Sequence, residues 1–308
     1  GGASSSESNA HVSSVAIGGG SGFLGSALAR YLTSNGHEVR RIGRRSSRAV
    51  EFHWDLDAGR LDPAALDGAD AVVNLAGETI AQRWTRDHKH IILSSRVRST
   101  ELLAKTMAAV RSPPRVFLST SAVGIYGPRG SEALDETSAP GTGFLADVVQ
   151  QWERAAVPAR DAGVRLVYPR LGVVMHPDGS ALAKLIPIFN IGGGGKIGKG
   201  NQWMSWIGLH DAVRALGFLM VADTLSGPVN VCSPNPVTNA ELSHTLGEVL
   251  HRPALATVPE FAVKLMFGEM GEETLLSGQR VIPRRLVDAG FQFEFPKLAD
   301  ALRHELGK

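Results

Sequence analysis

Residues 15–25 read Val-Ala-Ile-Gly-Gly-Gly-Ser-Gly-Phe-Leu-Gly. The apolar start is typical of a short buried strand, and helical spacing of apolar residues begins directly after the glycines. Gly19, Gly22 and Gly25 form the pattern Gly-x-x-Gly-x-x-Gly. The first glycine allows a tight turn, the second lets a pyrophosphate approach the backbone, and the third lets the helix pack on the strand. The stretch therefore predicts a dinucleotide-binding turn rather than a purely structural glycine turn.

The flanking sequence alternates between predicted strands and helices. Strands are expected at 12–17, 38–42, 51–54, 71–75 and 116–119, with a sixth bracketed by 164–168 and 171–175; helices are expected at 26–34, 94–110 and 144–156. This alternation predicts an α/β fold with a doubly wound parallel sheet of the Rossmann type. We expect a disordered tail at 1–11, a dinucleotide-binding domain at 12–175, and a smaller C-terminal substrate or lid lobe at 176–308, with later elements returning to the sheet.

Composition excludes several classes of protein. The 308 residues carry 32 Lys and Arg against 30 Asp and Glu, for a net charge of +2, and 43% of them are hydrophobic. These values fit a globular core and argue against intrinsic disorder. No long basic block predicts nucleic-acid binding, and no apolar run approaches the ~20 residues of a membrane span. No His, Asp or Glu cluster has ligand spacing, so we expect no metal.

The compartment is suggested by two features of the sequence. Its one cysteine, Cys232, fits a reducing environment, and residues 1–10 lack the apolar core of a secretory signal. We therefore expect a cytoplasmic protein, or one of an organellar matrix or stroma if the Ser-rich start is a transit remnant.

The end of the second predicted strand indicates which cofactor binds. An Asp or Glu at this position would accept hydrogen bonds from the ribose of NAD. The sequence instead reads Arg-Arg-Ile-Gly-Arg-Arg-Ser at 40–46, without an acid. Arg44 and Arg45, beside Gly43, can pair with a 2′-phosphate because guanidinium groups match phosphate geometry. The sequence therefore favours NADP(H) over NAD(H); the alternative is a solvated basic loop.

With these motifs, the chain resembles the extended short-chain dehydrogenase/reductases. It is most similar to their atypical NADP-binding "epimerase family" subgroup, which also carries the description cell-division-inhibitor-like. The matching strings are GGGSGFLG (18–25), VVNLAGE (72–78), SSRVRST (94–100), SAVGIYG (121–127), GNQWMSWI (200–207), GQRVIPRRL (278–286), AGFQFEFP (289–296) and ADAL (299–302). The resemblance covers about residues 12–306. Members often dimerise through the helices after the fourth and fifth strands, so a homodimer is one expectation.

The resemblance implies where the cofactor lies. Backbone around the glycine turn should hold the phosphates, the second strand end should hold the ribose phosphate, and the later strand ends should face the adenine and nicotinamide. The implied cofactor-binding residues are Gly19, Ser21, Gly22, Phe23, Leu24, Gly25, Gly43, Arg44, Arg45, Leu75, Ala76, Gly77, Arg96, Ser119 and Val174. For Arg96, a solvated helix face is the alternative.

The proton relay of the superfamily is missing. That relay is a Tyr-x-x-x-Lys pair on a helix plus a Ser, in which the Lys lowers the tyrosine pKa. None of the three tyrosines has a Lys four residues on, because those positions hold Asn35, Gly130 and Gly172. On the helix at 144–156, Phe144 or Leu145 takes the Tyr place and Val148 or Val149 the Lys place. These side chains cannot move a proton.

Two residues remain as catalytic candidates. Ser121 is the retained member of the relay. Tyr126 follows it on the predicted loop over the site and is either an acid/base or an aromatic wall against the substrate.

The second lobe supplies the candidate substrate residues. Glycines and lysines at 192–200 predict a flexible lid or a substrate loop, in which Lys196 either meets a charged substrate or is solvated. The motif is not an ATP P-loop, since Gly200 stands where Ser or Thr is needed. Trp203 and Trp206 either form a flat ligand surface or pack in the core. His210 is either a stand-in acid/base or simply hydrogen-bonded.

Two functions follow from these observations. The first is an NADP-dependent oxidoreductase or epimerase with a degenerate catalytic site, acting on a small polar or nucleotide-linked substrate whose class is inferred from the superfamily alone. The second is a non-catalytic NADP(H)-binding regulator, for instance of cell or organelle division. The missing Tyr and Lys favour the regulator, and the elaborate second lobe favours the enzyme.

Overall fold

A parallel sheet forms the centre of the computed structural model, which describes residues 13–77 and 79–308. The predicted tail at 1–11 lies outside the described residues. The strand order is β13-β8-β5-β4-β1-β2-β3, with β6 beside β8, and every pair is parallel. The strands are β1 (Ser14–Gly18), β2 (Glu38–Arg44), β3 (Phe52–Trp54), β4 (Ala71–Asn74), β5 (Val116–Ser119), β6 (Ser121–Ala122), β8 (Arg165–Leu171) and β13 (Gly227–Val231). The predicted doubly wound sheet is confirmed.

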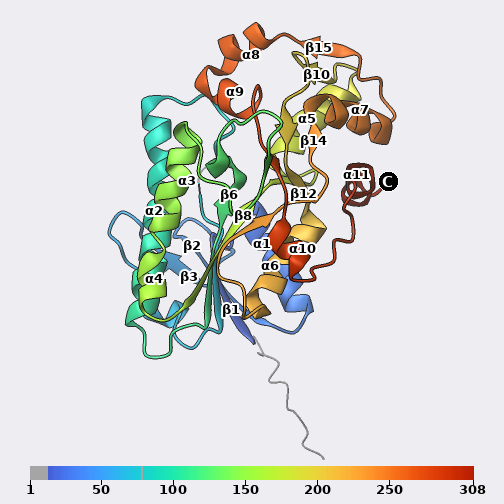
Figure 1. Cartoon of the computed structure of the whole chain (residues 1–308). Coiled ribbons are helices and arrows are strands. Elements are labelled where there is room, and N and C mark those ends of the chain that lie inside the picture. The colour runs from blue at the N-terminus through green and yellow to red at the C-terminus, as the bar shows by residue number, and fades with distance from the viewer. Residues whose placement is uncertain (1–12, 78) are drawn as a thin grey trace, which may run out of the picture.

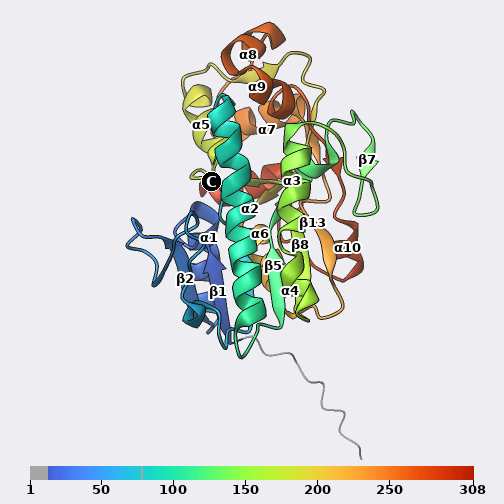
Figure 2. The same ribbon diagram turned by 90° about the vertical axis from the view of Figure 1, so that its left-hand side faces the viewer.

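Helices cover both faces of this sheet (Figure 1). One face packs against α1 (Phe23–Ser34) and α6 (Leu209–Val221), and the other against α2 (Arg86–Ala109), α3 (Phe144–Arg154) and α4 (Val157–Asp161). In Figure 2, α2 runs alongside α3 and, below it, α4. The middle of β1 is apolar on both faces of the sheet: Val15 and Ile17 join the core under α1, whereas Ala16 joins the core under α2. Successive side chains on a strand face opposite layers, so a central strand needs apolar residues throughout.

Two elements differ from the sequence predictions. Helix α2 begins at Arg86 rather than at 94, because Thr85 accepts a hydrogen bond from the His88 N–H at 3.1 Å and caps a first turn too polar to show a helical apolar pattern. The sixth strand is continuous through the bracketed gap as β8 and then breaks at Gly172, where a side chain would meet the Ser205 carbonyl at 2.9 Å. Beyond it the chain leaves the main sheet.

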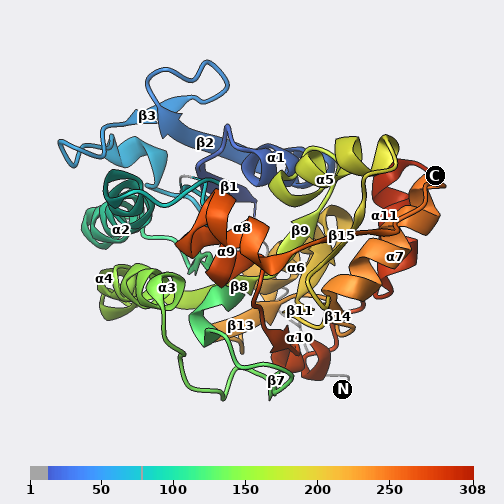
Figure 3. The ribbon, with the colours of Figure 1, turned by 90° about the horizontal axis from the view of Figure 1, so that it is seen from above.

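A second group of elements stands over the carboxyl ends of the sheet strands (Figures 1 and 3). Its core joins Met175, Leu182, Trp206, Leu246 and Leu302. Its helices are α5 (Ser180–Asn190), α7 (Asn239–Leu250), α8 (Glu260–Phe267), α9 (Glu269–Thr274) and α11 (Leu298–Leu306). Its paired strands are β10 (Gly195–Ile197) with β15 (Ala256–Val258), and β11 (Trp203–Met204) with β14 (Val237–Thr238).

Shorter elements link the two groups. Strand β9 (Val173–Met175) pairs with β12 (Trp206–Gly208), and β7 (Ala133–Leu134) pairs with β16 (Arg280–Val281). The remaining elements are α10 (Arg284–Asp288) and the 3-10 turns Pro63–Ala65 and Val123–Tyr126. Since α6 and β13 come back to the main sheet after residue 176, later elements do return to it; the domain boundary itself stays a prediction.

The structure corrects the prediction of a flexible lid at 192–200. Part of this segment forms β10, which pairs with β15. A Cβ at Gly195 would lie 1.7 Å from the Ala256 carbonyl oxygen, so glycine permits the two backbones to approach this closely. The glycines here build a strand contact within the second group.

We predict that Gly25→Ala destabilises the fold more than Gly22→Ala does, since the second change alters only the N-cap of α1. A Cβ at Gly25 would lie 2.3 Å from the Gly19 carbonyl oxygen, whereas the nearest atom to one at Gly22 is 3.4 Å away. Overpacking of this kind costs about 1–3 kcal/mol. Urea unfolding of both variants measures the loss; equal stabilities would contradict the packing role of Gly25.

Candidate functional site

The glycine turn after β1 is pressed against the chain that follows β4. Gly19 has φ +70°, and a Cβ there would lie 2.7 Å from the Ala76 nitrogen. A side chain at Gly25 would collide with the Gly19 carbonyl, so both glycines are required by packing. Arg41 of β2 holds the turn from the other side, since its Nε donates to the Gly20 carbonyl at 2.8 Å.

The middle of the motif is open. Gly22 is the N-cap of α1, and no side chain caps the helix there. Ser21 is exposed, and Phe23 and Leu24 are half-buried in the first turn. Free N–H groups at a helix N-terminus, with room above a glycine, form a cradle for a phosphate. The residues present therefore fit the pyrophosphate of a dinucleotide.

The end of β2, which is predicted to hold the ribose phosphate of the cofactor, lies beside this turn. A Cβ at Gly43 would lie 3.6 Å from Ser21 Oγ, which places the end of β2 next to the motif. Arg44 is exposed at this end, and Arg45 lines a surface hollow of about 430 Å³ together with His53 and Arg60. The arginines predicted to read a 2′-phosphate are thus adjacent to the glycine turn.

The chain after β4 is held rigidly. Asn74 is fully buried and donates through Nδ2 to Ser99 Oγ and Thr100 Oγ1, both at 3.1 Å. Its Oδ1 accepts from the Ala76 N–H at 3.1 Å. These bonds tie β4 to α2 and fix Leu75, Ala76 and Gly77, the segment predicted to run beneath the cofactor.

Arg96 of α2 lies against this segment. A Cβ at Gly77 would be 3.0 Å from the Arg96 guanidinium carbon, and that guanidinium stacks over the Trp152 ring at 5.3 Å. The side chain is half-buried between two layers rather than on a solvated helix face. This position is consistent with its predicted cofactor role.

Ser119 and Ser121 follow one another at the carboxyl end of β5. Ser119 is in register with Asn74, and its Oγ is buried with no hydrogen-bond partner. Ser121 Oγ donates to Glu153 Oε2 at 2.5 Å. Val174, the other residue predicted at the nicotinamide, is half-buried on β9.

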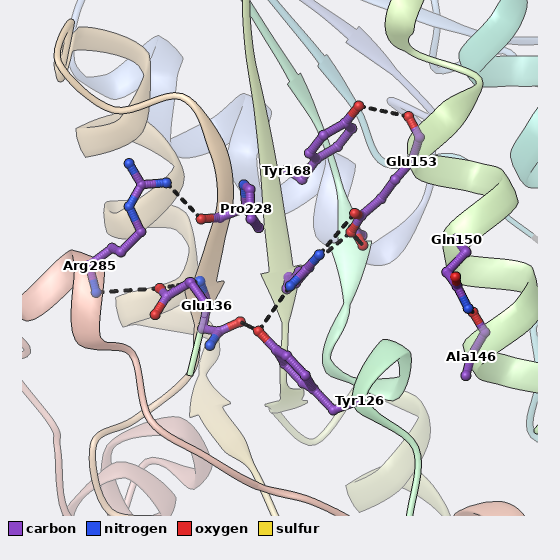
Figure 4. Close-up of polar contacts among 11 residues, drawn as sticks. Tyr126, Glu136, Ala146, Gln150, Glu153, Tyr168, Pro228 and Arg285 are labelled. Atoms are coloured by element: carbon purple, nitrogen blue, oxygen red, sulfur yellow. Dashed lines mark hydrogen bonds and ion pairs between the residues drawn. The ribbon is translucent and has the colours of Figure 1, made fainter. Parts of the chain in front are cut away.

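Glu153 and Arg170 form a buried ion pair that the sequence did not indicate. Arg170 Nε and Nη2 donate to the two carboxylate oxygens, both at 3.0 Å, and the side chains are only 8% and 12% exposed. The Tyr168 hydroxyl donates to the Glu153 main-chain carbonyl (Figure 4). Opposite charges on α3 and β8 signal a pair only when the fold is known, so no sequence pattern could have found it.

Tyr126 is sealed inside the protein. It is fully buried; its hydroxyl donates to Asn230 Oδ1 at 2.7 Å and accepts from Arg170 Nη1 at 3.0 Å. Burial raises the pKa of the phenol, so it does not lose its proton near neutral pH. These contacts oppose the acid/base interpretation of Tyr126 and make it a support for Arg170.

Glu136 is a second acid missed by the sequence analysis. Its Oε2 accepts from the Asn230 N–H at 2.9 Å, and from the Arg285 N–H at 3.3 Å (Figure 4). Its Oε1 is buried without a partner. Burial raises the pKa of this carboxyl.

The candidate substrate residues of the second lobe do not come together. Trp206 is fully buried, and its Nε1 donates to the Asn235 carbonyl at 2.8 Å, which fits the core-packing alternative. Trp203 is half-buried beneath the guanidinium of Arg280, at 4.7 Å. Lys196 is exposed on β10.

His210 lies among C-terminal residues. Its Nε2 is 2.8 Å from Glu294 Oε2, and its ring packs against Phe295 and His304. The described contacts of His210 favour the hydrogen-bonded alternative over a stand-in acid/base.

Helices α8 and α9 are attached directly above this site. Glu273 accepts from the N–H groups of Phe144 and Leu145, at 2.8 and 3.1 Å, and so caps the start of α3. Lys89 of α2 pairs with Glu269 at 2.9 Å. The C-terminal part of the chain thereby closes over the helix on which the superfamily carries its Tyr and Lys.

A glycine turn packed between parallel strands, with a serine after β5, defines an atypical extended short-chain dehydrogenase/reductase. Residues 15–232 match the model of the NAD dependent epimerase/dehydratase family, and residues 258–305 match a domain of unknown function (DUF1731). The chain belongs to the NAD dependent epimerase/dehydratase family.

Its relatives resemble it along nearly the whole chain. Epimerase family protein MT2273 of Mycobacterium tuberculosis is 44% identical over 290 residues, 94% of this chain and 96% of that protein. The crystal structure of human epimerase family protein SDR39U1 (isoform 2) with NADPH has a TM-score of 0.88 at 35% identity, covering 96% of this chain and 99% of that one. A nucleoside-diphosphate sugar epimerase of Corynebacterium glutamicum gives 0.80 at 35%, covering 97% of this chain and 59% of that one.

Neither a metal cluster nor a membrane-spanning helix is present in the part of the chain that the structure describes. Within 13–77 and 79–308, no group of three or more His, Cys, Asp or Glu side chains is placed to hold a metal ion. None of the helices described there is both long and apolar enough to span a membrane.

We predict that Arg44→Ala/Arg45→Ala weakens NADPH binding by about 10–100-fold and leaves NADH binding unchanged. Charge-assisted hydrogen bonds contribute about 1.5–3 kcal/mol, and 1.4 kcal/mol is a factor of ten. Calorimetric titration measures both affinities, with Arg48→Ala in the same exposed turn as the control. Equal losses for the two nucleotides would refute the 2′-phosphate assignment.

We predict that Glu136→Gln gains stability over the wild type as pH rises. A carboxyl whose pKa is raised in the folded state stabilises the fold below its unfolded pKa of about 4.3, and loses that contribution as pH rises through the folded value. The amide carries no charge, so the free-energy difference between variant and wild type should grow from about pH 4 toward neutral pH and then level off.

Denaturant unfolding across this range measures the difference. Glu132→Gln, an exposed residue of the same loop, is the control. A difference that is constant with pH would show that the Glu136 pKa is not raised.

Proposed function

We propose that the protein is an NADP(H)-dependent oxidoreductase or epimerase acting on a small polar or nucleotide-linked substrate. The observation that carries the proposal is the open cradle at Gly22, in a turn where Gly19 packs against Ala76 and Gly25 packs against Gly19. When bound, the nicotinamide of the cofactor would supply or accept a hydride. Ser121, after β5, is the hydroxyl that remains to orient the reacting oxygen.

The choice of NADP(H) rests on two supports. Arg44 and Arg45 stand where NAD-binding proteins use an acid, and the human relative was crystallised with NADPH. The substrate class is supported by the Corynebacterium relative, whose name is nucleoside-diphosphate sugar epimerase. We place the protein in the cytoplasm or in an organelle; a relative in Arabidopsis thaliana, 37% identical over 94% of this chain and 85% of that protein, is described as chloroplastic.

A specific observation favours a second function, a non-catalytic NADP(H)-binding regulator. The helix that should carry a proton relay has either Phe144 and Val148 or Leu145 and Val149 at the relay positions, and all four side chains are apolar. Cofactor binding without any hydride transfer would be the property of such a regulator.

The test separates cofactor binding from reaction. Gly22→Asp adds a side chain that caps α1 and preserves the fold, but its charge opposes the pyrophosphate. Gly22→Asn is the neutral control of nearly equal size. We expect calorimetry to show that the wild type binds NADPH and that the Asn variant loses little of this affinity. The Asp variant should bind at least about tenfold more weakly than the Asn variant, as expected for a charge interaction of ~1.5 kcal/mol.

The reaction is followed by NADPH absorbance with a panel of aldehydes, 9,10-phenanthrenequinone, and, with NADP⁺, UDP-glucose. Hydride transfer to or from any of these compounds supports the enzyme. NADPH binding with no transfer to any of them would favour the regulator, and equal NADPH affinities of the Asp and Asn variants would overturn the cradle.

A further inference from the structure

We infer that Glu153, acting through Ser121 and held by Arg170, takes the place of the missing Tyr and Lys as the proton relay of this site. The inference rests on the proposed hydride transfer. It concerns three side chains that come from α3, β6 and β8 and meet at one point.

The position of Glu153 on its helix is the first support. Leu145, Val149 and Glu153 recur at intervals of one helical turn, so they share one face of α3. Leu145 and Val149 are one of the two pairs, beside Phe144 and Val148, that take the places of the superfamily's Tyr and Lys. Glu153 is the next position along this face, and it is the first whose side chain can exchange a proton.

The contact with Ser121 is the second support. The Oγ–Oε2 distance of 2.5 Å is in the range of a hydroxyl donating to an ionised carboxylate. Ser121 is itself buried in β6, directly after β5, and is in register with Arg170 of β8. A serine whose proton is already directed at a base keeps its lone pairs for a substrate hydroxyl.

Arg170 is the third support. It binds both carboxylate oxygens and donates its remaining Nη1 bond to the Tyr126 hydroxyl, which Asn230 fixes in turn. Burying an ion pair costs desolvation free energy that the attraction between the charges often fails to recover, so such a pair is weak evidence for a purely stabilising role.

The same three side chains can move a proton during alcohol oxidation and during carbonyl reduction. In alcohol oxidation, the substrate C–H leaves as a hydride to the oxidised nicotinamide, and the substrate O–H gives its proton to Ser121 Oγ. Ser121 gives its own proton to Glu153 Oε2, which becomes a neutral carboxyl and returns the proton to water. In carbonyl reduction Glu153 first takes a proton from water; the carbon then accepts the hydride, the C=O pair moves to oxygen, Ser121 gives its proton to that oxygen, and Glu153 returns a proton to Ser121.

The test uses NADPH with 9,10-phenanthrenequinone as the acceptor and three variants. Ser121→Ala cuts the path but leaves the ion pair intact. Glu153→Gln removes the relay charge, and Glu153→Gln/Arg170→Gln removes both charges, so that no unpaired arginine is left to unfold the chain. Glu101→Gln, an exposed residue paired with Lys105 on α2, is the matched control.

We expect each of the three variants to lose ~10²–10⁴-fold in turnover, as is typical of removed general acid/base catalysis. NADPH affinity by calorimetry should change less than about threefold, and the solvent deuterium isotope effect should rise because proton delivery becomes limiting. Ser121→Ala/Glu153→Gln should be no slower than Ser121→Ala, since residues of one relay act as a unit.

Three outcomes overturn the inference. If Glu153→Gln/Arg170→Gln is folded and retains wild-type turnover, or if the effects of Ser121→Ala and Glu153→Gln simply multiply, Glu153 is structural and the proposed hydride transfer still stands. If the wild type binds NADPH but transfers no hydride to the quinone or to the other compounds of the panel, the proposed function fails and the relay fails with it.

Discussion

The close contact between the glycine turn and the chain after β4 is the constraint on which the rest of the structure depends. Through this contact the ends of β1 and β4 lie side by side, and the start of α1 is exposed above them. Asn74 then ties the end of β4 to α2 through two side-chain hydroxyls. Every candidate group of the cofactor site is positioned relative to this one backbone contact.

Arg170 orients two of the polar side chains in the site. One guanidinium orients a carboxylate on α3 and a phenol at the end of the turn Val123–Tyr126. The superfamily uses a helix-borne cation beside a phenol for proton transfer, and here the cation is on a strand and the nearest acid is on the helix. The phenol has become a support whose burial keeps it protonated.

Local patterns in the sequence predicted the sheet, its parallel order and the glycine turn, because these depend on apolar runs and on backbone freedom at a few positions. The Glu153–Arg170 pair could not be predicted, since its residues are 17 positions apart on different elements and meet only after β8 and α3 are packed. Trp206 illustrates the same limit: a tryptophan beside glycines fits a ligand surface or a core, and only the surrounding residues decide between them. Polar first turns such as that of α2 also escape prediction, because a cap rather than an apolar face holds them.

The attachment of Glu273 to the first turn of α3 has a consequence for how the chain can diversify. The two family matches divide the chain at 232 and 258, yet a carboxylate from the second region supplies the N-terminal cap of a helix in the first. The C-terminal region is therefore not an interchangeable module. Recombination between relatives at this boundary would preserve the cap of α3 only where the incoming segment brings an acid to the same place, so the two regions should be inherited together.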